Sequence, residues 1–163
     1  MNKFILTFSK SPSFRLITVF LMIALPFISL AQDVVITDGS VITCDGVFID
    51  DGGTGGLPYT PGNDYTFTIC PDNPGDVIQV SFVAFALYTS PNPNNSDRLF
   101  IFDGDDATAT GLGSYTGNSL QGLPVTGTIN NTSGCLTFVF DSNPNGPGTF
   151  PGWEAIISCT TPC

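Results

Sequence analysis

Short runs in which apolar and polar residues alternate limit the fold of this chain more than any other feature. In residues 64–70 (DYTFTIC), Tyr65, Phe67 and Ile69 alternate with threonines. Four further runs carry apolar residues in the same manner: 77–85, 98–102, 135–140 and 153–159. Turn-forming segments such as PDNPGD and SPNPNNSD separate these runs. Because a period of two between turn signals is typical of half-buried strands, the sequence predicts an all-β fold, a two-sheet antiparallel β-sandwich.

The first 31 residues differ in composition from the rest. Lys3, Lys10 and Arg15 precede an apolar run of 15 residues, 16–30, which contains Pro26 and ends just before Ala31. This order predicts a secretory signal peptide over 1–31, cleaved after Ala31, and the run is short for a membrane span. An uncleaved N-terminal anchor is the alternative. Residues 32–163 then form a single domain, and we expect the mature chain to be secreted or to lie at the cell surface, with no insertion into the membrane.

The charge and composition of residues 32–163 exclude nucleic-acid binding and most kinds of catalytic site. This segment holds all 14 acidic residues but only one basic residue, Arg98, and no histidine, so its formal net charge is −13. Nucleic-acid binding needs many lysines and arginines, which are absent here. Serine-histidine triads, Schiff-base lysines and histidine-ligated zinc are equally excluded. We therefore predict a protein that is not an enzyme and that requires no cofactor.

Five cysteines remain in the exported segment: Cys44, Cys70, Cys135, Cys159 and Cys163. In an oxidising compartment such residues form disulfides more often than they act as reactive thiols. We expect the first four to form two structural bridges, although spacing alone does not decide the pairing. Cys163 is then a free thiol, an intermolecular link or a sign that the natural chain continues.

Several motifs, in order, resemble a known family. After Cys44 come FIDDGG (48–53) and a tyrosine-containing stretch, and after Cys70 come GDVIQVSFVAF (75–85), DRLFIFDG (97–104), LTFVFDS (136–142) and GWEA (152–155). Together they resemble the CUB domain, in the form found in secreted bacterial proteins. The resemblance implies a jelly-roll-like sandwich of two sheets. It also implies the disulfides Cys44–Cys70 and Cys135–Cys159.

The same resemblance implies a calcium site that presents a surface to a basic side chain of a partner. The three positions that carry charged ligands in the family correspond to Tyr88, Asp97 and Asn143, so one carboxylate of three is kept. Calcium affinity falls as carboxylates are lost. Calcium binding is thus left open, with Asp97, Asn143 and Asp141 as the candidate metal ligands.

Two tyrosines are the remaining candidates for ligand contact. Tyr88 occupies a position where the family has an acid, and Tyr115 lies in a loop-like segment, GLGSYTGNS. Exposed tyrosines suit recognition of proteins or sugars, although both rings could instead pack over sheet edges. We predict an extracellular recognition module that binds a protein or a glycan, the protein being basic because of the negative charge. The alternative is an accessory or adhesive domain of a larger secreted protein, such as a secreted protease, of which this chain would be the N-terminal part.

Overall fold

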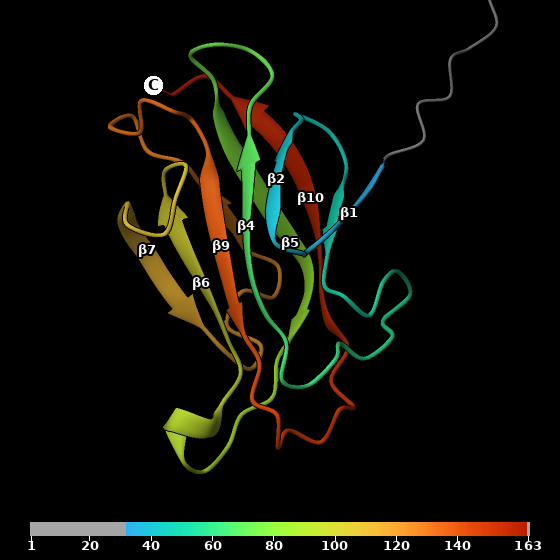
Figure 1. Ribbon diagram of the computed structural model, residues 1–163. Helices are drawn as coiled ribbons and strands as arrows, with labels where there is room; N and C mark the ends of the chain where they lie inside the picture. The colour runs from blue at the N-terminus through green and yellow to red at the C-terminus, as the bar shows by residue number, and fades with distance from the viewer. Residues whose placement is uncertain (1–31, 163) are drawn as a thin grey trace, which may run out of the picture.

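The computed structural model describes residues 32–162 and places ten strands in two facing sheets (Figure 1). The predicted signal peptide over 1–31 and Cys163 lie outside the described residues. In sheet order, sheet A contains β1 (Asp33–Val35), β3 (Val47–Ile49), β10 (Gly152–Thr160), β5 (Val77–Ala86) and β8 (Pro124–Thr126). Sheet B contains β2 (Gly39–Ile42), β4 (Asp64–Cys70), β9 (Leu136–Asp141), β6 (Arg98–Asp103) and β7 (Thr110–Tyr115). A short 3₁₀ helix, η1 (Pro93–Asn95), precedes β6.

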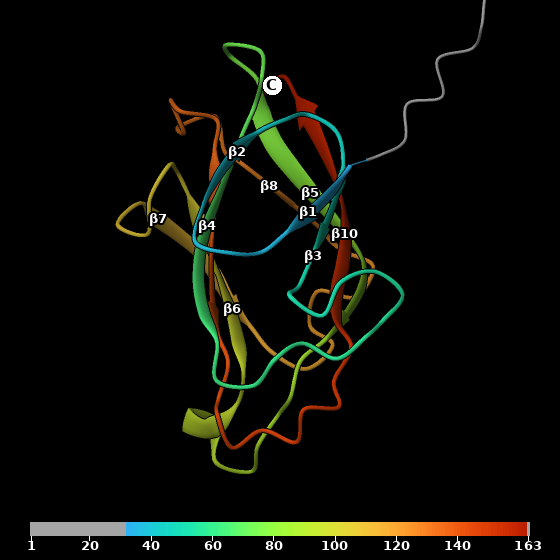
Figure 2. The same cartoon turned by 45° about the vertical axis from the view of Figure 1, so that its right-hand side comes forward.

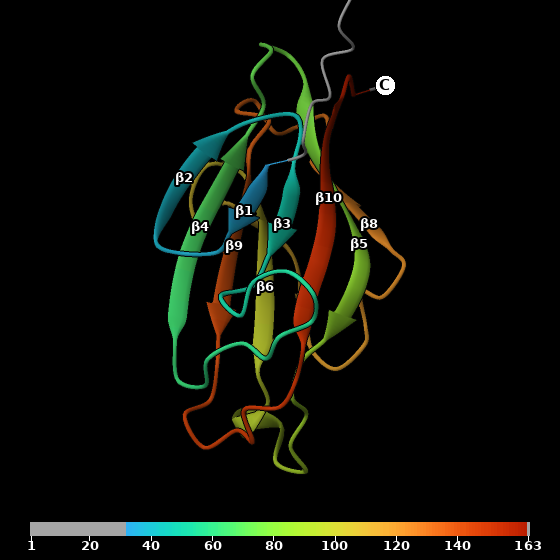
Figure 3. The same cartoon turned by 90° about the vertical axis from the view of Figure 1, so that its right-hand side faces the viewer.

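The predicted all-β sandwich is confirmed, with one difference in strand direction. The pairs β1–β3 and β2–β4 are parallel, whereas the other pairs are antiparallel. The first four strands alternate between the two sheets (Figures 2 and 3). The strand β3 therefore lies beside β1 and runs in the same direction, and β4 does the same beside β2. Parallel neighbours need a long connection, and here the intervening strand in the opposite sheet provides it.

Aromatic side chains fill the space between the sheets. Trp153 of β10 packs against Phe140 of β9 with ring centres 5.0 Å apart, and Phe48 of β3 lies 4.7 Å from Phe138. Along β10, Trp153, Ala155 and Ile157 are buried, while Glu154 and Ile156 face away from the core. This is the alternation that the sequence pattern predicts. The aromatic core therefore holds the two sheets together.

The four expected cysteines form two disulfides, but the predicted pairing is wrong. The bonds are Cys44–Cys159 and Cys70–Cys135, with Cα atoms 5.0 and 4.1 Å apart. Because β4 pairs with β9 so that Ile69 faces Leu136, the next residue, Cys70, faces Cys135 in the same sheet. Cys44, which follows β2 of sheet B, meets the end of β10 and joins the two sheets. Strand order, rather than nearness in sequence, sets the pairing.

Three loops gather at one end of the sandwich, drawn at the bottom of Figure 1. They are residues 50–63, 87–97 and 142–151, and together they are called the loop end below. The Gly62 N–H donates to Ser142 Oγ at 2.8 Å, which ties the first loop to the third. No helix within residues 32–162 has both the length and the apolar character needed to cross a membrane.

Candidate binding site at the loop end

Asp97 is the centre of the loop end. It directly precedes β6, is 1% exposed, and both of its carboxylate oxygens accept hydrogen bonds. Oδ2 accepts from the Tyr59 hydroxyl, and Oδ1 accepts from the Asn143 N–H at 2.7 Å. The Asp97 N–H in turn donates to the Tyr88 carbonyl at 3.0 Å. One buried carboxylate therefore connects all three loops, as expected for a buried acid that must be fully paired.

Tyr59 completes this network from the first loop. Its hydroxyl donates to Asp97 and accepts from the Tyr88 N–H at 3.0 Å. Burial, followed by the hydrogen bond to Asp97, raises the pKa of the Tyr59 hydroxyl well above its usual range. Tyr59 thus stays protonated and acts as a donor to Asp97. The loop in which Tyr59 lies shows no periodic pattern, so only the presence of a tyrosine in this stretch could have pointed to the contact.

Asp50 is a second buried carboxylate, at the end of β3. Its Oδ1 accepts from the Gly52 N–H and its Oδ2 from the Trp153 N–H, each at 2.8 Å. Burial raises its pKa from 3.8 to about 6, and the two hydrogen bonds oppose that rise. A Cβ on Gly152 would lie 2.1 Å from Asp50 Oδ2, and Gly152 has a φ of +68°. Glycine is therefore needed at 152 for both space and backbone conformation.

The predicted metal ligands are only partly brought together. Asp97 and Asn143 meet, but through the backbone N–H of Asn143, whose side-chain Oδ1 accepts from the Asn145 N–H at 2.8 Å. Asp141 is exposed at the end of β9, where it stands opposite Asp64 of β4 and Arg98 of β6. Partial burial and the nearby charges of Asp64 and Asp97 raise the pKa of Asp141, and Arg98 lowers it.

These residues do not fit a calcium ion well. Calcium takes about six to eight oxygens, several of them from carboxylates. At the centre of the loop end, Asp97 supplies one carboxylate, whose two oxygens already accept protein hydrogen bonds, and Tyr88 replaces an acid. Within residues 32–162, the one cluster of three or more potential ligand side chains is Cys44, Asp72 and Cys159, and its two cysteines form a disulfide. The donor set thus falls short of what the resemblance implies.

The two candidate tyrosines differ in their surroundings. Tyr88 is half-buried, and its ring lies against Phe150 with centres 5.5 Å apart, so an aromatic pair joins the second and third loops. The Tyr115 hydroxyl donates to the carbonyl of Leu112 in its own strand at 3.2 Å, and its ring covers Gly113. Tyr115 therefore packs along β7, whereas Tyr88 lies within the loop end. Phe150 was not anticipated, because no pattern in 142–151 marks it.

Comparison with known proteins gives a structural match. No family model and no curated protein sequence matches the chain. Among solved structures, the MASP-1 CUB2 domain bound to Ca²⁺ superposes with a TM-score of 0.57 at 17% identity, covering 75% of this chain and 98% of that one. The fold is that of a CUB domain.

Two larger proteins contain the same fold as one part. The CUB1-EGF-CUB2 region of human MASP-1/3 matches with a TM-score of 0.58 at 20% identity, covering 78% of this chain and 43% of that one. The full extracellular region of zebrafish Gpr126/Adgrg6 matches with a TM-score of 0.58 at 18% identity, covering 76% and 15%. This chain spans less than half the length of either. The two disulfides are of the kind that forms in oxidising compartments.

Proposed function

We propose that this chain is a non-catalytic extracellular recognition module that binds a basic protein through its loop end. The observation that carries the proposal is the negative charge where β4 and β9 meet the loop end. Asp64 and Asp141 stand directly opposite each other on β4 and β9. Like charges in that position destabilise a sheet, so a cationic partner would relieve a repulsion already present in the free protein.

Arg98, the one cation within residues 32–162, stands opposite Asp141 and lowers its pKa, but burial and the charges of Asp64 and Asp97 together raise that pKa more. The Arg98 guanidinium donates to the Pro93 carbonyl at 2.9 Å and to Ser114 Oγ at 3.5 Å. The Arg98 guanidinium donates no hydrogen bond to the carboxylate of Asp64 or of Asp141. The acids at this end are thus available to lysines or arginines of a partner.

The aromatic pair supports the same choice of partner. Tyr88 lies in the second loop and Phe150 in the third loop, which directly follows Asp141, and both rings are partly exposed. Aromatic rings attract cations through their faces and are common in interface centres. A patch that combines carboxylates with aromatic rings suits a lysine- or arginine-rich surface better than a neutral glycan.

The buried acids argue against catalysis and for binding that does not depend on calcium. Asp50 and Asp97 are committed to hydrogen bonds that hold the loops in place. The network around Asp97 orders the loop end with protein donors alone, which is the role that an ion would otherwise take. As a second candidate, the domain serves as an accessory part of a larger secreted protein, since the matched human and zebrafish structures carry the fold as one part of a longer chain.

An array of short peptides tests the proposed function. The purified protein, in EDTA, should prefer lysine- and arginine-containing peptides over matched neutral and acidic peptides, and added salt should weaken this binding because it screens surface charge. The double variant Asp64→Asn/Asp141→Asn should lose the preference. The control Asp33→Asn/Asp105→Asn removes the same charge from two exposed acids outside the loop end and should keep it. Equal binding of all peptide classes, or selective binding only of glycans, would refute the proposal.

A further inference from the structure

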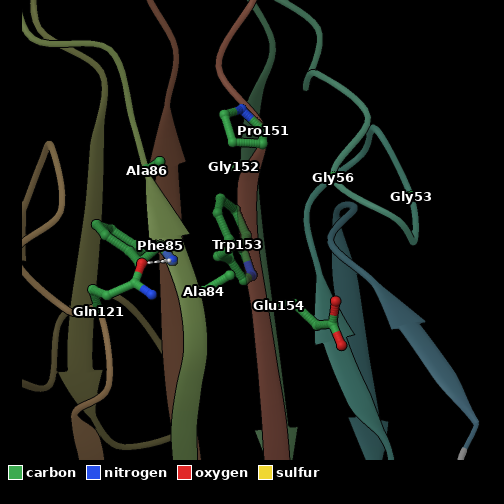
Figure 4. A pocket seen from close by; sticks show the side chains of 10 residues that line it. All are labelled: Gly53, Gly56, Ala84, Phe85, Ala86, Gln121, Pro151, Gly152, Trp153 and Glu154. Carbon is green, nitrogen blue, oxygen red and sulfur yellow. Dashed lines mark hydrogen bonds between the residues drawn. The ribbon is translucent and has the colours of Figure 1, made fainter.

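The outer face of sheet A carries a small hollow that lies apart from the Asp97 centre (Figure 4). Its volume is about 130 Å³, and Ala84 and Ala86 of β5, Glu154 of β10 and the Gly53 and Gly56 positions of the first loop line it. An apolar cavity of about 150 Å³ can hold a benzene molecule. The hollow is therefore large enough for the end of one side chain and too small for a drug-sized ligand.

Bare backbone forms much of its wall. Gly53, Gly56 and Gly152 have φ values of +87°, +70° and +68°, which favour glycine. A Cβ on Gly53 would meet no atom within 4 Å, and one on Gly56 would meet only the Pro151 side chain. The glycines thus allow the backbone conformation of this wall and add no side chain to it.

A β-bulge exposes apolar residues on the face around the hollow. The register between β10 and β5 shifts between Glu154 and Ala155, which leaves the consecutive residues Val83 and Ala84 both exposed. Val83 is 56% exposed and Ile156, two residues beyond Glu154, is 43% exposed. The face is thus apolar around the hollow, with a single acid at its rim.

Glu154 is that acid, and its neighbours on the adjacent strands are apolar. Its register partners are Ile49 on β3 and Ala84 on β5. In Figure 4 the Glu154 side chain extends to the same side of β10 as the 53–56 loop, and the one hydrogen bond drawn among the lining residues joins Gln121 to Phe85. No residue that lines the hollow donates a hydrogen bond to the Glu154 carboxylate. A carboxylate without a partner, next to apolar surface, attracts a cation that has an apolar stem.

A second acid lies behind the hollow. The Asp50 carboxylate is buried against Gly152, one of the lining residues. No basic residue lines the hollow. The local field is therefore negative, and it favours a positive charge that enters beside Glu154.

We propose that this hollow binds the side chain of a lysine or arginine from a partner protein, with the aliphatic stem over Ala84 and Ala86 and the charged end at Glu154. Val83 and Ile156 then contact apolar residues that flank the bound side chain. This is a second contact surface, on the outer face of sheet A where the first and third loops border it. It does not depend on the proposal for the loop end, because Asp64 and Asp141 take no part in it.

The test uses amino acids capped as N-acetyl methylamides and nuclear magnetic resonance of the full chain as it is secreted. Capped lysine and capped arginine should shift the amide signals of residues 84–86 and 152–154 and the indole signal of Trp153, the chain's one tryptophan. Capped norleucine, which keeps the stem but lacks the charge, should cause at most small shifts. The lysine and arginine titrations show which cation binds more tightly.

Two variants keep the test decisive. Glu154→Gln should weaken capped-lysine binding about five-fold, since a partly exposed ion pair is lost, while Asp45→Asn, an exposed acid outside the hollow, should leave it unchanged. Ala84→Leu should block binding by filling the hollow, and this position is exposed enough to tolerate the change. Absence of shifts, equal binding of norleucine, or unchanged binding in Glu154→Gln or Ala84→Leu overturns the proposal. Loss of peptide binding in Asp64→Asn/Asp141→Asn with intact hollow binding separates the two surfaces.

Discussion

Replacing Asp97 should destabilise the protein strongly, whether or not calcium is present. In Asp97→Ala, the Tyr59 hydroxyl and the Asn143 N–H both lose a charged acceptor inside the fold. Hydrogen bonds to charged groups contribute about 1.5–3 kcal/mol each, so the free energy of unfolding should fall by about 3–6 kcal/mol. A domain of this size has about 5–15 kcal/mol in total, so the variant should be close to unfolding.

Urea denaturation followed by the fluorescence of Trp153 measures this loss. Because Asp97→Ala could leave too little folded protein, Tyr59→Phe provides a milder version. It removes one hydroxyl, and with it the bond to Asp97 and the bond from the Tyr88 N–H, and should cost about 2–4.5 kcal/mol. For each of the three proteins, the free energy of unfolding in EDTA should equal that in millimolar calcium. A loss below about 1 kcal/mol for Asp97→Ala would show that the network does not hold the loops. A calcium-dependent rise in wild-type stability would show that an ion binds after all.

Three further perturbations test the structure elsewhere. Because the folded-state pKa of Asp50, about 6, lies above 3.8, the stability that Asp50 contributes is fully present below about pH 4 and is lost as the pH rises through 6. Wild-type protein should therefore lose about 3 kcal/mol more than Asp50→Asn between pH 3 and pH 7 in urea titrations, and parallel profiles would contradict this. Replacing Cys44 and Cys159 by serine opens a 115-residue loop, and calorimetry should show a loss of about 5 kcal/mol by the loop-entropy relation; an unchanged melting temperature would argue against the bond. Asn131→Ala removes donors to Asp103 and to a backbone carbonyl at 2.8 and 2.7 Å, so its melting temperature should drop by several degrees, with a neutral result counting against the contact.

The long strands could be predicted from the sequence because their own residues carry the signal. The 64–70 run coincides with β4, and β5, β6, β9 and β10 begin and end within one residue of the predicted runs. The strands β1, β2, β3 and β8 have three or four residues, too few for a period of two to stand out. The β7 segment, TGLGSY, is rich in glycine, a composition that predicts a loop rather than a strand.

The disulfide pairing and the loop end depend on contacts between distant parts of the chain. Cys70 reaches Cys135 only because β4 lies next to β9, and spacing does not encode which strands are neighbours. Asp97 was singled out from its motif, but its partner Tyr59 is 38 positions away in an irregular loop. Sequence patterns thus identify which residues are special more readily than which residues meet.

The most direct test of the recognition proposal is the salt dependence of binding to one lysine-rich peptide chosen from the array, measured by calorimetry in EDTA. The account predicts that affinity falls steadily as salt increases. It also predicts that the Asp64→Asn/Asp141→Asn variant, unlike Asp33→Asn/Asp105→Asn, binds weakly at every salt concentration. Affinity that is independent of salt, or equal in the two double variants, would contradict the claim that the acidic loop end recognises a basic partner.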